Sequence, residues 1–578
     1  MNGKDTLSAV KMKNCRYSGM TGTLAKNIID NWLLGLKESN PAILSMFAER
    51  DKLPYRDLLQ WSGEFAGKYL TGAYYIYRIT FDERLKNECI EFCDEFIGYQ
   101  DQDGYLGCYS KECHLTGAFS QDPNTLGTWD AWAHYHWMFA LLLWYRETGK
   151  NEYLGTVKRA AELFIKLFYN PESGNKRLSE IGWTEMNLSP IHVFALLYEE
   201  TSDKKYIDFA NKIAEDFGSA GAGDYINSAL NGLEFYQCPK PRWESLHCII
   251  GVAELYRADG NEKYLSVARQ IFHSILKTDV HNTGGFSTQE QAIGNPYTGG
   301  PIETCCVIAY NALAVEILKL TGSSIVADHL ERSHYNACMG MWSPTGRWST
   351  YDTPMNGVRL ANTTQIHFQS RPGSPELNCC SVNAARSIGM IGEWAIMESG
   401  GKIHINAYEN AEYETENGVK ISVSGGYPYN NRISVSVSGA SQEIMLRIPK
   451  WSENTVIING ETQYRPKSGE YFAVKFKENR PVAVEFDFST RFEDGHLELE
   501  GLTSIFRGPI LFGTDTSICG CHDLDNLPVL SRIEISAIPT TVTGEKAHIC
   551  LPNGVTLGDF YHLGVTGARY VSWLKTEE

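Results

Sequence analysis

From about residue 25 to 400, hydrophobic residues recur at three- and four-residue spacing in segments separated by short polar turns. In one segment, apolar residues occupy Tyr264, Val267, Ile271 and Ile275, the spacing of a helix with one buried face. Each turn joins an aromatic residue or Leu to a residue that opens the next helix. The turns lie at 77–85, 145–153, 198–206, 256–264 and, more loosely, 318–322. This pattern predicts a series of αα-hairpins.

The spacing of the turns predicts how the hairpins are arranged. They lie 53 to 68 residues apart, which is too long for a solenoid of about 34 residues per repeat. The interval suits two helices and a variable loop. Five hairpins, with a further one at the start, predict a closed toroid of about six helix pairs, an (α/α)6 barrel. An open helical array is the alternative.

Long loops rich in aromatic, His and acidic residues connect the hairpins. In a toroid, such loops converge at one end of the barrel and line a pocket, the usual place for function on a rigid scaffold. They occupy residues 100–107, 128–136, 182–187, 242–247 and 282–290. We therefore expect the functional residues at this end.

After about residue 400, apolar and polar residues alternate in short runs separated by Gly, Asn and Pro. The runs lie at 402–408, 419–424, 432–437, 443–448, 455–458 and 482–488. This pattern predicts a β-sandwich. We divide the chain into a helical catalytic domain, 1–400, and a β region, 401–578, of one or two modules. No low-complexity linker separates them, so we expect the sandwich to pack firmly on the helical domain.

Composition narrows the range of partners. The 52 basic and 69 acidic side chains give a net charge of −17, and no Lys/Arg run is dense enough to follow a phosphate backbone. We therefore exclude nucleic acid. The N-terminus lacks an apolar signal segment, and no later segment has the length to span a bilayer. We expect a cytoplasmic protein without a membrane partner, whose 15 cysteines are mostly reduced.

Two short segments contain residue types that bind metal ions. Glu303 and Cys305 lie two residues apart, and Cys379 and Cys380 are adjacent. One carboxylate and three thiolates would form a closed tetrahedral zinc site. Such a site could be a structural staple or part of a reaction centre, and core thiols without a metal are a third interpretation. Cys306 falls within a helical pattern and is expected to pack inside.

Glu290 lies thirteen residues before Glu303, in a loop rich in Gly, Ser, Thr and Gln with no helical period. It is either a surface residue or a functional acid. Cleavage of a sugar acetal needs one group to protonate the leaving oxygen and another to attack the anomeric carbon. Zinc would hold Cys379 as the thiolate, which is the nucleophilic form. The two residues could therefore form such a pair.

These motifs resemble glycoside hydrolase family 127, the β-L-arabinofuranosidase family. The resemblance rests on Gln289-Glu290, on Glu303-Thr-Cys305, and on Cys379-Cys380-Ser-Val-Asn383 followed by Arg386. It extends over nearly the whole chain. The further motifs are Trp61-Ser-Gly-Glu-Phe, Asp103-Gly-Tyr-Leu106, Glu331-Arg-Ser-His-Tyr-Asn336, Leu446-Arg-Ile-Pro-Lys-Trp451 and Arg507-Gly-Pro509.

The resemblance implies an (α/α)6 catalytic domain followed by β-sandwich modules. It implies a zinc ion (Zn²⁺) bound by Glu303, Cys305, Cys379 and Cys380. It also implies a retaining double displacement, with Cys379 as the nucleophile and Glu290 as the acid/base.

The resemblance also indicates residues that contact the sugar. By position along their helices, His136 and Tyr351 match such residues of the family. Asn187 stands where a sugar-binding His is expected, so the sugar itself is not determined. His247 leads into a helix and is either a sugar contact or a satisfied core histidine. The two residues after the cysteine pair replace prolines that are common in the family.

Two other sets contain residue types that bind metals. His134 and His136 lie two apart where a helix starts, so they point to different faces, and we expect one in the pocket and the other buried or on the surface. The second set lies in the β region, where free thiols are the alternative to a second metal. It consists of Cys519, Cys521, His522 and Asp523.

Together these features predict a zinc-dependent retaining exo-glycosidase that acts on β-L-arabinofuranosides or a related small carbohydrate, with a homodimer as an option. A non-catalytic carbohydrate-binding protein is an alternative from a different class. A sugar lyase or epimerase on the same toroid, which would need no thiolate, is another.

Overall fold

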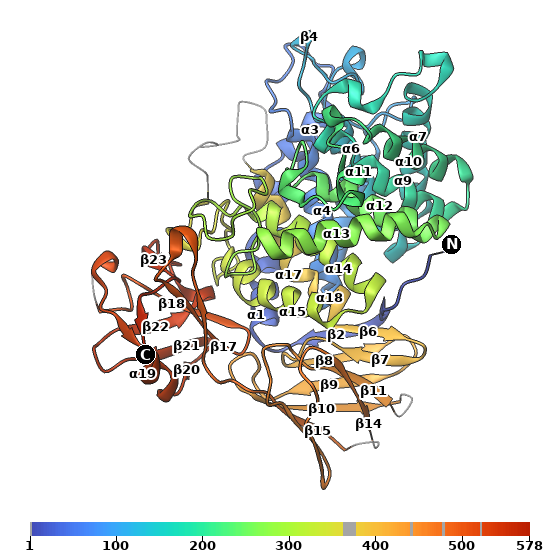
Figure 1. Cartoon of the computed structure of the whole chain (residues 1–578). Helices are drawn as coiled ribbons and strands as arrows, with labels where there is room; N and C mark the ends of the chain where they lie inside the picture. Colours follow the sequence, from blue (N-terminus) through green and yellow to red (C-terminus); the bar gives the residue numbers. More distant parts are fainter. Residues whose placement is uncertain (1–2, 362–376, 440–442, 477–479, 521–522) are drawn as a thin grey trace.

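The computed structural model describes residues 3–361, 377–439, 443–476, 480–520 and 523–578. Figure 1 shows a helical body that contains both the first helices and residues near 390, with the β-rich C-terminal region packed below and beside it. The prediction of a helical domain followed by β modules is confirmed.

The helical body is a closed ring of inner helices backed by outer ones. Each inner helix packs against the next, and the ring closes where α16 and α17 contact both α14 and α4. The inner helices are α4 (Phe65–Thr80), α6 (Asp130–Thr148), α9 (Pro190–Thr201), α12 (Ser245–Asp259), α14 (Thr304–Thr321), and the short α16 (Cys379–Asn383), α17 (Ala385–Gly389) and α18 (Ile391–Trp394). The predicted toroid is therefore correct, and the open array is wrong.

The outer helices each pack on an inner partner. They are α1 (Met20–Ile28), α5 (Glu83–Ile97), α7 (Asn151–Leu167), α10 (Lys204–Asp216), α13 (Glu262–Thr278) and α15 (Ser324–Arg332). Outer helices are amphipathic: α10 buries Tyr206, Phe209 and Ile213 on one face. Inner helices are buried over most of their surface because neighbours surround them. Smaller helices in the loops are α2 (Leu36–Ser39), α3 (Ala42–Ala48), α8 (Thr184–Asn187) and α11 (Tyr225–Leu230).

The inner helix α14 also corrects an expectation. It is long and apolar enough to cross a membrane, although no segment was expected to reach that length, and 83% of its apolar stretch is buried inside the protein. Its composition follows from its place in the inner ring, where most of its residues are buried.

The hairpin turns follow one stereochemical pattern. α6, α12 and α14 end at Gly149, Gly260 and Gly322, each with positive φ, which glycine adopts without steric cost. The next helix often begins with a side chain that accepts a hydrogen bond from its first turn, as Asp82 and Asn261 do. These residues explain why the turns could be recognised from the sequence.

A sandwich of two sheets follows the toroid. The first sheet has the order β1 (Ser8–Ala9), β6 (Ile396–Ser399), β7 (Lys402–Ile405), β11 (Glu443–Arg447), β14 (Tyr471–Lys475). The second has the order β13 (Thr462–Tyr464), β12 (Val456–Asn459), β15 (Val482–Glu485), β10 (Arg432–Ser438), β9 (Lys420–Ser424), β8 (Ala411–Thr415), β2 (Met12–Tyr17). The chain therefore starts in the sandwich, because β1 and β2 precede the first helix.

A separate sheet forms from the last part of the chain. Its order is β16 (Arg491–Asp494), β17 (Thr503–Arg507), β18 (Ile510–Asp515), β22 (Thr556–Asp559), β21 (Lys546–Cys550), β20 (Thr541–Thr543). β23 (Tyr570–Val571) joins β18 to β5 (Asn356–Gly357) of the helical domain. Two small pairs are β3 (Ala118–Phe119) with β4 (Asp122–Leu126), and β19 (Leu530–Ser531) with β24 (Thr576–Glu577).

Buried ion pairs join the sandwich to the toroid. The fully buried guanidinium of Arg447 in β11 bonds Asp328 and Glu331 of α15, and its Nε donates to the Asn406 carbonyl at 2.8 Å. Tyr427 also donates to Glu331, at 2.6 Å. The firm packing expected between the two parts is therefore present.

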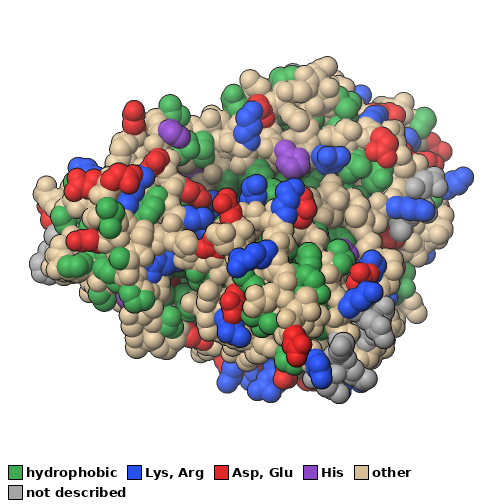
Figure 2. Space-filling model, turned by 60° about the horizontal axis from the view of Figure 1, so that its bottom comes forward, with side chains coloured by type: hydrophobic (Ala, Val, Ile, Leu, Met, Phe, Trp, Pro, Cys, Tyr) green, Lys and Arg blue, Asp and Glu red, His purple; other side chains and the backbone are tan. Residues whose placement is uncertain are grey.

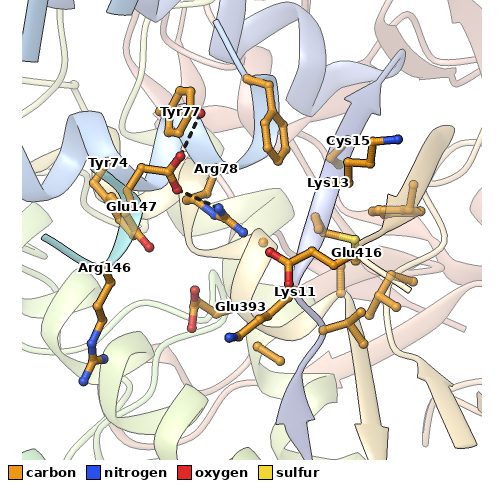
Figure 3. Close-up of a pocket in the computed structure, with 18 of the residues that line it drawn as sticks. Lys11, Lys13, Cys15, Tyr74, Tyr77, Arg78, Arg146, Glu147, Glu393 and Glu416 are labelled. Carbon is orange, nitrogen blue, oxygen red and sulfur yellow. Dashed lines mark hydrogen bonds and ion pairs between the residues drawn. The ribbon is translucent and has the colours of Figure 1, made fainter. Parts of the chain in front are cut away.

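The base of the toroid faces the sandwich across a hollow of about 980 Å³. Residues from three hairpin turns line it together with strand β2, so these turns gather at one end of the barrel. Figure 3 shows Glu147 in this hollow, bonded by Tyr77 at 2.9 Å and by Arg78 at 2.8 Å. The loops between hairpins consequently gather at the opposite end. Figure 2 shows basic and acidic side chains interspersed over one face of the molecule.

Candidate metal centre and active site

Four predicted ligands come together between two helix starts. Glu303 is the N-cap of α14 and Cys305 lies in its first turn, while Cys379 and Cys380 open α16. Their ligand atoms all lie within 4.8 Å of one another, and all four residues are buried. Cys380 Sγ lies 3.3 Å from Glu303 Oε1 and 3.6 Å from Cys305 Sγ, and the two adjacent sulfurs are 3.9 Å apart.

These distances fit a single zinc ion. A tetrahedral ion about 2.3 Å from each sulfur separates two sulfurs by about 3.8 Å, close to the separations of 3.6 and 3.9 Å. One carboxylate and three thiols are also a donor set that zinc accepts. Cys306 lies outside the four and contacts the other carboxylate oxygen, Oε2 of Glu303, at 3.5 Å.

The electrostatics of the cluster favour the protonated forms of three of its four groups. Burial raises the pKa of Glu303 well above its usual range, and the charges of Glu290 and Cys379 raise it further. A hydrogen bond with Cys305 and burial raise the pKa of Cys379 to about 12. Burial also raises the pKa of Cys380. A dication is the species that would hold such groups ionised at neutral pH.

Tyr351 lies beside the sulfur predicted to be the nucleophile. Its hydroxyl is 3.4 Å from Cys379 Sγ, and the side chain is buried. Its backbone is held beside the cluster because its carbonyl accepts a hydrogen bond from Thr304 N at 2.9 Å. The structure therefore brings Tyr351 to the cluster.

Glu290 lies in a loop with a strained backbone. Gln289 and Glu290 have φ of 52° and 67°, the left-handed region that non-glycine residues rarely adopt. Arg242 Nη2 donates to the Glu290 carboxylate at 2.8 Å and to Glu244 at 2.6 Å. The Glu290 side chain is 27% exposed. Its charge acts on Glu303 and Tyr351, so the carboxylate lies near the cluster and remains open to solvent.

Arg242 was not predicted as a functional residue. It lies next to Trp243 in one of the loops that the sequence placed at the pocket. The sequence did not indicate that it pairs with Glu290, 48 residues away. It holds the Glu290 carboxylate in place.

His136 and His247 meet around the indole of Trp132. Their ring centroids lie 4.3 and 5.1 Å from that of Trp132 and 5.4 Å from each other. Nε2 of each imidazole is buried and has no hydrogen-bond partner among the described residues, and the same holds for Nε1 of Trp243. Buried polar atoms without partners are costly, so this group is suited to the hydroxyls of a bound ligand. Burial and the Lys68 and Arg386 charges lower the pKa of both imidazoles.

Tyr135 links His247 to a third imidazole. Its hydroxyl lies 2.8 Å from Nδ1 of His247 and 3.1 Å from Nδ1 of His192. His134 points elsewhere: its Nδ1 lies 2.8 Å from the Asp130 carbonyl and its Nε2 accepts a hydrogen bond from a backbone N–H. The two histidines at 134 and 136 thus face different sides.

Asn187 uses its amide within the scaffold. Its Oδ1 accepts from Trp132 N at 3.3 Å, and its Nδ2 donates to the carbonyls of Thr128 and Gly182 at 3.2 and 2.9 Å. These bonds tie α8 to the start of α6. A sugar contact by Asn187 stays a prediction.

The structure describes only part of the second predicted metal-binding set, at residues 519–523. Cys519 is buried, while Cys521 and His522 lie outside the described residues.

Comparisons with known proteins agree with this geometry. Residues 16–393 match the family described as β-L-arabinofuranosidase, GH127 catalytic domain, and residues 402–490 match its GH127 middle domain. No curated protein sequence matches the chain.

Among solved structures, a GH127 β-arabinofuranosidase aligns over 100% of this chain and 99% of its own with a TM-score of 0.78 at 17% identity. A GH127 β-L-arabinofuranosidase from Geobacillus stearothermophilus T6 aligns over 98% and 100% with a TM-score of 0.77 at 17% identity. At such identity these structures establish the shared fold.

Proposed function

Because the chain belongs to glycoside hydrolase family 127, the β-L-arabinofuranosidase family, we propose that it is a retaining exo-glycosidase. It would release a terminal β-L-arabinofuranosyl residue or a related sugar from a small carbohydrate. The observation that supports this best is the buried cluster of Glu303, Cys305, Cys379 and Cys380 with Glu290 near it.

Cys379 and Glu290 would carry the two displacement steps. In the first, the Cys379 thiolate attacks the anomeric carbon, a C–S bond forms, and the C–O bond to the leaving group breaks as Glu290 protonates the departing oxygen. In the second, Glu290 takes a proton from water, the water oxygen bonds to the anomeric carbon, and the thiolate leaves. The partly exposed carboxylate of Glu290 suits this role, because both leaving group and water approach from solvent.

The other residues would hold the reactants. Zinc bound by Glu303, Cys305, Cys379 and Cys380 would supply the positive charge that keeps Cys379 ionised at neutral pH. Tyr351 would orient the Cys379 sulfur through its hydroxyl. The unpartnered Nε2 atoms of the two imidazoles at Trp132 would bind sugar hydroxyls, and the neutral state of the imidazoles lets each act as donor or acceptor.

A test uses aryl β-L-arabinofuranosides with zinc-loaded, reduced protein. We expect Cys379→Ser and Glu290→Gln each to lower turnover by at least about 10²-fold, the usual contribution of a positioned acid or nucleophile. Cys338→Ser is a matched control, because this buried thiol contacts Asn311 and Ser333 away from the cluster. Near-normal turnover in either variant would refute the assignment. Release of an unsaturated or epimerised sugar would instead indicate a lyase or epimerase.

A further inference from the structure

Lys68 is a buried lysine beside a predicted metal ligand. It lies on inner helix α4, its side chain is 1% exposed, and its Nζ is 3.8 Å from Cys305 Sγ. The ammonium also lies 5.6 and 5.4 Å from the ring centroids of Trp132 and Trp243. Lysine is almost never fully buried unless it is paired. Its position in the apolar ring therefore requires partners that compensate its charge.

Glu64 anchors this ammonium. Lys68 Nζ donates to Glu64 Oε1 at 2.8 Å, one helical turn earlier, and Trp132 donates to the other oxygen, Oε2. Both carboxylate oxygens of Glu64 thus have donors within the scaffold. The carboxylate fixes where the ammonium points.

Two donors contact the sulfur of Cys305. Cys305 Sγ lies beside the cationic Lys68 and also accepts from Asn383 Nδ2 at 3.5 Å. Cys379 Sγ lies 3.4 Å from the hydroxyl of Tyr351, and the charge of Lys68 acts on this thiol as well. Donors in the outer shell of a metal site tune the ligands they contact. A cationic donor withdraws electron density from a thiolate, so the contact with Lys68 makes the Cys305 sulfur less nucleophilic.

The net charge of the centre also favours a cation at the position of Lys68. Three thiolates and one carboxylate around a dication carry a net charge of −2, and a buried net charge is costly without a counter-charge. The ammonium of Lys68 lies where it offsets part of this charge. Its loss should therefore weaken metal binding as well as change the electronic state of Cys305.

We propose that Lys68, anchored by Glu64, is a positioning residue that holds Cys305 as a metal ligand and offsets part of the negative charge of the centre. This inference rests on the proposed function, since it assigns roles within the same centre. It goes beyond the four ligands, because it assigns a task to a buried cation outside them.

The test compares wild type, Lys68→Met, Lys68→Arg and the double variant Glu64→Gln/Lys68→Met. Lys68→Met alone leaves the Glu64 carboxylate buried without its cation, which lowers stability. The double variant also removes that carboxylate, so it tests the loss of the ammonium apart from this loss of stability. Metal affinity is measured by competition with a chromogenic zinc chelator. The sulfur-to-metal charge-transfer band of the cobalt-substituted protein reports the electronic state of the thiolates. Lys86→Met is the control, since Lys86 pairs with Glu147 at the other end of the barrel.

We expect zinc affinity to fall at least about tenfold in both Lys68→Met proteins, as for other losses of outer-shell partners. The charge-transfer band should move to longer wavelength, because a thiolate without its cation is ionised more easily. Lys68→Arg should retain most of both properties. If the folded double variant has the zinc affinity and the charge-transfer band of wild type, this inference is wrong and the proposed function stands. A wild type that holds no stoichiometric zinc would overturn the proposed metal centre and this inference with it.

Discussion

The hydroxyl of Tyr135 is the group whose removal tests the sugar pocket most directly. It is buried and shared between Nδ1 of His247 at 2.8 Å and Nδ1 of His192 at 3.1 Å. A phenol has one hydrogen, so it donates to one imidazole and accepts from the N–H of the other. The two imidazoles therefore carry opposite tautomers. This arrangement sets whether Nε2 of His247 is a donor or an acceptor.

Tyr135→Phe removes both hydrogen bonds while the ring keeps its place. Each of the two buried ring nitrogens that loses its partner costs about 1–3 kcal/mol, so the free energy of unfolding should fall by about 2–6 kcal/mol. Because His247 would no longer be held in one tautomer, we expect KM for an aryl β-L-arabinofuranoside to rise about tenfold. The value of kcat should change less, since Cys379 and Glu290 are untouched.

The measurements are urea unfolding and steady-state kinetics, with Tyr153→Phe as the matched control. Tyr153 is a tyrosine of outer helix α7 whose hydroxyl donates to Asp94 at 2.8 Å, so its loss should reduce stability without affecting KM. A Tyr135→Phe protein within about 0.5 kcal/mol of wild type would show that the hydroxyl does not bridge the imidazoles. An equal rise in KM for Tyr153→Phe would show that the effect is not local.

Two further predictions concern stability. Arg447→Met leaves Glu331 buried without its cation, and we expect urea unfolding to show a loss of about 3–5 kcal/mol; a loss below about 1 kcal/mol would contradict the role given to this pair. Burial raises the pKa of Glu409 from 4.5 to about 7, so its neutral form stabilises the fold fully below pH 4.5 and this contribution is lost as pH rises through about 7. Glu409→Gln should remove about 3 kcal/mol of this pH dependence, whereas the same change at the exposed Glu412 should leave it intact.

Local patterns in the sequence determined the elements and the members of each ligand pair. Helical spacing and recurring turns predicted the hairpins, because a glycine with positive φ and an N-capping side chain act within a few residues. Glu303 with Cys305, and Cys379 with Cys380, are neighbours in the chain, so their ligand chemistry could be read directly. The period of two after residue 400 likewise predicted the sandwich.

Only the tertiary structure decided which distant residues meet. Lys68 lies 237 positions from Cys305, and Arg242 lies 48 from Glu290. The bridge of Tyr135 spans 112 residues to His247. Such contacts arise because the closed ring brings the ends of non-consecutive helices to one pocket, and no local periodicity records which side chains face each other there. For the same reason the strands at residues 8–17 pair with sheets formed nearly 400 residues later.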